Sequence, residues 1–207
     1  MKRTQVTWIG LILLAVALAP SAMAADVTEF LARMPAQSVA DGEMVNAELV
    51  AMGPDAVKQL CAMLVPPGGD DVNVRYALSG LAKYVSLGSR GDARTMVEGA
   101  FLAGLDAAQD AEVKAFLMRQ LGLAGTAASV APLAAYLGDD RLCEPATQAL
   151  TAIGGPEATA ALLGALDGAT GARRATIIKA LGELRCAVAA AKIVVDAASE
   201  DWNTRWT

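Results

Sequence analysis

The sequence contains no histidine. Histidine is the commonest general base and metal ligand in proteins, so its absence excludes Ser-His-Asp and Cys-His catalysis and histidine-based zinc sites. A Cys-x-x-Cys-His haem-attachment motif is missing for the same reason. The glycines form neither Gly-x-Gly-x-x-Gly nor Gly-Lys-Ser/Thr, so no phosphate-binding loop is indicated. We therefore expect no enzyme activity, no bound metal and no cofactor.

Cysteine is nearly absent as well. The three cysteines are an odd number and cannot all pair within one chain. A disulfide-stabilised exported domain would carry a denser and even-numbered set. Cys61 falls on an apolar stripe from Val57 to Leu64, so we interpret it as a small buried hydrophobe. A bridge between Cys143 and Cys186 remains an open alternative.

Basic and aromatic residues are scarce. Lysine and arginine number 17 against 22 acidic residues, which gives a net charge of −5. An acidic chain lacks the positive patch that nucleic acid and anionic lipid require. Tryptophan, tyrosine and phenylalanine occur three times each and are scattered, so no base-stacking platform is indicated. The apolar fraction owes more to alanine, the best helix former, than to β-branched residues, which favours an all-α fold.

The first 24 residues have the pattern of a secretory signal peptide. Lys2 and Arg3 precede an apolar run, which Pro20 breaks before the small-residue motif Ala22-Met23-Ala24. This order of basic, apolar and small residues predicts cleavage before Ala25. The alternative, an uncleaved membrane anchor, is disfavoured because the run is shorter than the roughly 20 residues that span a bilayer. We predict a periplasmic or secreted protein with no membrane contact after cleavage.

A repeat of roughly 30 residues runs through the rest of the chain, inside the range typical of helical arrays. Three apolar helical stripes end in a similar way: Arg119-Gln120-Leu121-Gly122, Thr151-Ala152-Ile153-Gly154 and Lys179-Ala180-Leu181-Gly182. Glycine commonly ends helices, so we interpret these glycines as helix ends.

A second repeat marks the helix starts. An Asp or Thr that can cap a helix is followed four residues later by a long polar side chain. The pairs are Asp71…Arg75, Asp110…Lys114, Asp140…Glu144, Thr170…Arg174 and Asp201…Arg205. We interpret each pair as the start of the second helix of a hairpin.

The two repeats divide the chain after the signal peptide into a helical cap and an array. Residues 25–53 form the cap, with expected helices over Val27–Met34 and Ser38–Met52. Residues 54–207 form four hairpins and an incomplete fifth. The expected hairpin helices are Asp55–Leu64 with Val72–Leu87, Gly91–Leu105 with Asp110–Ala124, Ala128–Leu137 with Arg141–Ile153, Pro156–Leu166 with Gly171–Leu184, and Ala187–Ser199.

Two segments resemble HEAT repeats of the short bacterial kind found in phycobilisome lyases. They are residues 130–140, which read VAPLAAYLGDD, and residues 177–184, which read IIKALGEL. The resemblance is good over residues 110–206, weaker over 53–104 and absent before that. It implies a right-handed α-solenoid of antiparallel hairpins, like armadillo and HEAT proteins, whose second helices line a concave face.

The chain ends in Asp201-Trp202-Asn203-Thr204-Arg205-Trp206-Thr207, which resembles the start of a further helix. We therefore interpret the sequence as the N-terminal piece of a longer protein. Trp202 and Trp206 are expected to pack beneath that helix, although an exposed recognition pair is an alternative.

Candidate functional residues are the polar side chains near the starts of the second helices. Arg75, Lys114, Arg173 and Arg174 are the predicted partner-binding residues. The alternative is that they form a structural ladder with the aspartates of the turns. The Asp70-Asp71 and Asp139-Asp140 pairs are interpreted as helix caps, not as calcium ligands or an acid–base pair.

These observations favour a non-catalytic exported scaffold that binds a protein or peptide on its concave face. Two alternatives stay open. The segment can be the spacer of a longer enzyme whose catalytic module lies beyond residue 207, or a bilin-lyase-like protein. The bilin-lyase alternative is weakened by the signal peptide, and because the same repeat serves many functions.

Overall fold

The computed structural model describes residues 27–197, except the side chains at positions 192 and 195–197. The described part is all-α and contains no strand, which confirms the predicted fold class at that level. The helices are α1 (Val27–Ala32), α2 (Val39–Met52), α3 (Pro54–Ala62), α4 (Val72–Ser86), α5 (Gly91–Ala107), α6 (Ala111–Ala124), the 3₁₀ turn η1 (Ala127–Ser129), α7 (Val130–Ala134), α8 (Cys143–Ile153), α9 (Gly155–Leu166), α10 (Gly171–Glu183) and α11 (Ala187–Ala197).

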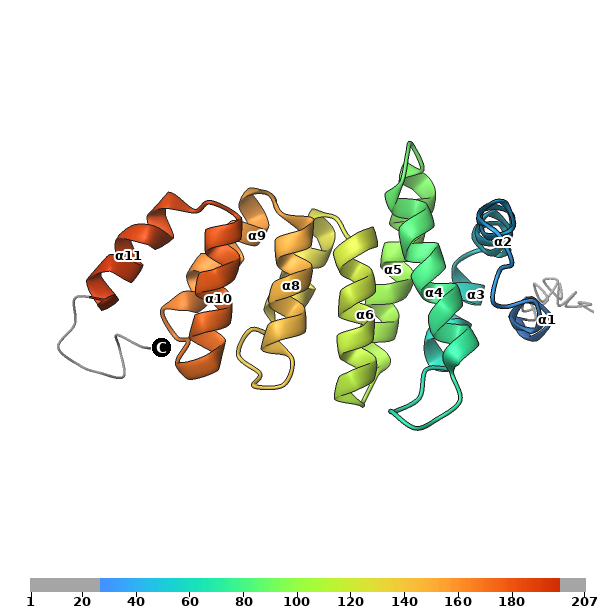
Figure 1. Ribbon diagram of the computed structural model, residues 1–207, viewed down its shortest axis with the longest axis horizontal. Coiled ribbons are helices and arrows are strands. Elements are labelled where there is room, and N and C mark those ends of the chain that lie inside the picture. The colour runs from blue at the N-terminus through green and yellow to red at the C-terminus, as the bar shows by residue number, and fades with distance from the viewer. Residues whose placement is uncertain (1–26, 198–207) are drawn as a thin grey trace, which may run out of the picture.

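The helices follow one another along an elongated body, from α1 at one end to α11 at the other (Figure 1). Helices α2, α4, α6, α8 and α10 pack in succession, and we call them the even row. Behind them α3 packs on α5, and α7 on α9; we call these four helices the odd row. Contacts of α5 with α6 and of α9 with α10 join the two rows.

The core runs as one continuous apolar cluster through both rows. Its largest fully buried side chains include Leu60, Leu78, Phe101, Leu117 and Leu150. Alanines fill the closest contacts between helices, because a small side chain lets two helix backbones approach. The alanine-rich composition therefore serves packing as well as helix propensity.

The three repeated glycines have different roles, so the prediction that all three end helices is wrong for two of them. Gly154 is the C-cap of α8, with a φ of 67°. Gly122 lies inside α6, where an added Cβ would stand 3.3 Å from the Cα of Ala149 in α8. Gly122 is thus required by close packing. Gly182 lies inside α10, with open space where a Cβ would be.

The predicted caps also differ from one another. Asp110 accepts hydrogen bonds from the backbone N–H groups of Glu112 and Val113, as a capping side chain should. Asp71 and Thr170 stand at cap positions without a capping bond from their side chains. In the third hairpin Asp139, not Asp140, accepts from the backbone N–H groups at positions 141 and 142.

The third hairpin is shorter than predicted. The expected helix 128–137 is a 3₁₀ turn followed by the five residues of α7, and α8 begins at Cys143 instead of Arg141. Pro145 has no N–H and is tolerated only in the first turn of a helix, which places the helix start close before it. The other predicted helices agree with the structure to within about three residues at each end.

Cys61, Cys143 and Cys186 are all free thiols, and Cys61 is buried as expected. The Cys143–Cys186 bridge is therefore not formed. The predicted signal peptide, the pair Asp201…Arg205 and the two terminal tryptophans lie outside the described residues. Within residues 27–197 no helix is both long and apolar enough to cross a bilayer.

Candidate functional site

The first predicted binding residue, Arg75, is engaged within the fold. Its Nε lies 2.8 Å from Oδ1 of Asp71, and its Nη2 donates to the carbonyl of Val65 at 2.9 Å. Its guanidinium also lies over the ring of Phe116 in α6, 4.8 Å from the centroid. Arg75 therefore fastens the turn before α4 and joins α4 to α6.

Arg174, Arg173 and Lys114 make similar contacts to turns. Arg174 donates to the carbonyl of Leu166 at the end of α9, at 2.7 Å. Arg173 pairs with Asp140 at 3.0 Å and donates to the carbonyl of Gly138 at 2.7 Å. The ammonium of Lys114 lies over the ring of Tyr136, 5.1 Å from the centroid.

Arg75 and Arg173 pair with turn aspartates, as the structural-ladder alternative expects. Lys114 instead contacts Tyr136, and Arg174 donates to the carbonyl of Leu166. Lys114 and Arg173 both reach the segment between α7 and α8, whereas Arg75 and Arg174 reach two other turns, so the structure does not gather all four into one site. The reason is helical geometry, since a residue four positions after the cap lies one turn above it on the same side.

The contact between Asp71 and Arg75 is the most buried of these. Burial alone would raise the pKa of its carboxyl group. The hydrogen bonds from Arg75 and the backbone N–H of Val65, with the charge of Arg75, outweigh this and lower the pKa below its ordinary value. Asp71 therefore stabilises the fold as a carboxylate.

We expect Asp71→Asn to reduce the free energy of unfolding by about 1 to 2 kcal/mol at neutral pH. Because the folded-state pKa is lowered, the stabilisation is complete above the ordinary pKa of 3.8. It disappears as the pH falls through the folded-state value. Urea unfolding of both proteins at neutral pH and near pH 3 should show the difference shrinking. Asp70→Asn, at the exposed neighbour, is the control, and an unchanged difference at low pH would contradict the assignment.

The exposed side of the even row contains a groove between α2 and α4. It consists of two adjoining hollows of about 320 and 260 Å³ that share six lining residues. The shared residues are Ala36, Gly42, Asn46, Tyr76, Gly80 and Lys83. Gly80 leaves space between the two helices, since a Cβ there would meet the amide of Asn46 at 3.3 Å.

Large apolar side chains stand open to solvent along this groove. Val39 is 87% exposed, Leu87 50% and Tyr76 46%, and all three line it. Exposed single apolar residues are common, but these three line one groove, which suits it to contact with a partner.

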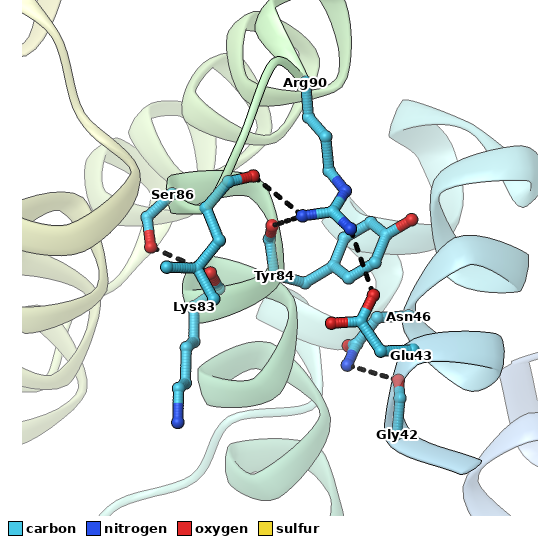
Figure 2. A network of polar contacts seen from close by, with 8 residues as sticks. Gly42, Glu43, Asn46, Lys83, Tyr84, Ser86 and Arg90 are labelled. Carbon is cyan, nitrogen blue, oxygen red and sulfur yellow. Dashed lines mark hydrogen bonds and ion pairs between the residues drawn. The ribbon is translucent and has the colours of Figure 1, made fainter. Parts of the chain in front are cut away.

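A polar network fixes one end of the groove (Figure 2). Arg90 stacks on the ring of Tyr84, 3.9 Å from the centroid, and donates to the carbonyls of Tyr84 and Leu87. Its Nη2 pairs with Glu43 of α2 at 3.0 Å. The network ties α2 to the turn after α4 at this end of the groove.

A second groove, of about 560 Å³, lies between α8 and α10. Its lining includes the small residues Ala152 and Ala175 and the charged residues Glu144, Lys179 and Glu183. The ammonium of Lys179 is 4.0 Å from the carboxylate of Glu183, a weak exposed pair.

Both grooves use equivalent positions of their second helix. Tyr76 follows Asp71 by five residues, and Ala175 follows Thr170 by five. Three of the predicted binding residues, Arg75, Lys114 and Arg174, stand four after the cap, one position earlier. Consecutive side chains on a helix point about 100° apart. The residue four after the cap therefore points toward the adjoining turn, and the residue five after the cap points toward the groove.

The odd row has a separate apolar pocket of about 570 Å³ between α3 and α5. Cys61 and Gly104 form part of its wall. Burial raises the pKa of the Cys61 thiol to about 12. The thiol therefore stays protonated at neutral pH and is a poor nucleophile.

Three further polar residues, which the repeats in the sequence do not mark, hold turns in place. Arg90 and Arg94 donate to turn carbonyls, Arg94 to those of Ala124 and Gly125. Glu98 is a buried carboxylate of α5. The signal for Glu98 is present in the sequence: it stands at helical spacing before Phe101, on an otherwise apolar stripe.

No protein-family model matches the sequence, and no curated protein or solved structure is significantly similar to it. In residues 27–197 no three acidic, cysteine or histidine side chains gather as a metal site would require.

Proposed function

We propose that this protein is a non-catalytic, exported scaffold that binds a peptide segment of another protein along the even row. The helix pairs form a right-handed HEAT-like solenoid, and the even row is its concave, partner-binding side. This is the function expected from the sequence, with the contact residues moved from the turns to the grooves.

The observation that carries the proposal is the pair of grooves on the even row. Each is formed between neighbouring helices of that row, and both use equivalent helix positions. Their volumes, from about 260 to 560 Å³, suit individual side chains of a bound chain. Recognition of a peptide by such a surface needs exposed apolar anchors, which the α2–α4 groove has in Val39, Tyr76 and Leu87.

A peptide selection tests this proposal. The full chain is immobilised, and binders are selected from a random library of 12-residue peptides. Fluorescence anisotropy then compares the affinity of the best peptides for the wild type with that for Tyr76→Arg and Gln148→Arg. We expect one or both variants to bind about tenfold more weakly.

Ala160→Arg is the matched control, because Ala160 is an exposed position of α9 in the odd row. It should change the affinity by less than about twofold. Selected peptides that lose affinity equally for Ala160→Arg, or a selection that enriches none, would contradict binding on the even row.

A further inference from the structure

The charges along the even row do not match the net charge of the protein. The chain is acidic overall, yet Lys83 lines the α2–α4 groove as an exposed cation. Within the described residues its ammonium has no hydrogen bond or ion pair. In Figure 2 its side chain extends away from the Arg90 network.

The acidic groups near Lys83 are already occupied. Glu43, the acidic residue lining the groove, is paired with Arg90 at 3.0 Å. The carboxylate of Asp41 accepts a hydrogen bond from the backbone N–H of Gln37 at 2.8 Å. The groove therefore carries one uncompensated positive charge beside an apolar wall.

The next helix of the even row adds a second exposed cation. Arg119 of α6 lies nine residues after Asp110, the spacing at which Gly80 follows Asp71 and lines the groove. The side chain of Arg119 is exposed and makes no ion pair with another described residue. Leu123, one turn further along α6, is 47% exposed.

We propose that the α2–α4 groove, continued onto α6, binds a segment of another protein that alternates apolar and acidic side chains. This inference rests on the proposed function and names its ligand class. A carboxylate of the segment pairs with Lys83 and the next one with Arg119. An apolar side chain between Val39 and Tyr76 supplies most of the affinity, because exposed ion pairs contribute little alone and fix specificity.

The opposite end of the row provides an internal comparison. The α8–α10 groove has two carboxylates, Glu144 and Glu183, and one ammonium, Lys179. Its net charge is therefore negative. We expect an acidic segment to bind the α2–α4 groove in preference to this one.

Three fluorescein-labelled 12-residue peptides test the inference: one alternating Leu and Glu, one alternating Leu and Lys, and one alternating Ser and Glu. We expect the full chain to bind the Leu–Glu peptide at least about tenfold more tightly than either of the others. Lys83→Glu should weaken that binding about tenfold, and added salt should weaken it further. Tyr76→Ala should weaken it to a similar extent without changing the net charge.

Lys179→Glu is the matched control, since it changes the net charge equally in the other groove. It should leave the affinity for the Leu–Glu peptide within about twofold of the wild-type value. Equal losses for Lys83→Glu and Lys179→Glu, or tighter binding of the Leu–Lys peptide, would overturn the inference. If library selection yields basic peptides that bind the even row, the proposed function stands while this inference fails.

Discussion

Glu98→Ala is expected to lower the free energy of unfolding by about 3 kcal/mol or more. Glu98 is only 4% exposed. Its carboxylate accepts hydrogen bonds from the backbone N–H of Thr126 at 2.8 Å, from the Thr126 hydroxyl, and from the hydroxyl of Ser129 at 2.5 Å. Alanine would leave these buried donors without partners and would open a cavity between α5 and η1.

Urea unfolding followed by circular dichroism measures this effect. Asp106→Ala is the control, because Asp106 is an exposed acidic residue of the same helix and should change stability by less than about 0.5 kcal/mol. Glu98→Gln keeps one acceptor oxygen, and its amide N–H can donate to the Thr126 hydroxyl. It should therefore lower the free energy of unfolding by less than Glu98→Ala does. Equal stabilities of Glu98→Ala and Asp106→Ala would show that the buried network does not hold η1.

Gly104→Ala is expected to destabilise the protein by about 1 to 3 kcal/mol, although alanine is the better helix former. A Cβ at Gly104 would stand 2.8 Å from Cβ of Cys61 and 3.1 Å from its Sγ. Cβ of Cys61 is fixed to the backbone of α3 and cannot swing away. The substitution must therefore push α3 and α5 apart.

Gly99→Ala in the same helix should have the opposite effect. No atom lies within 4 Å of the Cβ position at Gly99. Alanine there is expected to raise the free energy of unfolding by about 0.5 to 1 kcal/mol. Both variants replace a glycine of α5 with alanine, and the same unfolding measurement is used for both. The same sign of change for both would contradict the packing of α3 on α5.

The sequence predicted most helices because apolar periodicity, glycine and proline are local signals. The apolar stripes and the cap pairs placed α2 to α6 and α8 to α10 close to their observed limits. The roles of individual glycines could not be predicted this way. Gly122 and Gly182 occur in similar tetrapeptides, yet only Gly122 faces a neighbouring helix at close range.

The candidate site was predicted less well for a geometric reason. Arg75 and Arg174 recur at cap spacing because they hold the turns, and turns repeat more regularly than binding surfaces do. The groove depends on Val39 at the start of α2 and Leu87 just after α4, which show no shared spacing in the sequence. Only the packing of α2 against α4 brings them together.

Hydrogen–deuterium exchange of the full chain, with and without a peptide selected from the library, tests the central proposal most directly. Amides protected by the peptide should concentrate on the even row, in α2 and α4 around Asn46 and Gly80 and in the last two turns of α6. The odd-row helices α5 and α9 should exchange at unchanged rates. Protection confined to α5 and α9, or to the pocket beside Cys61, would contradict the proposal that the even row is the binding surface.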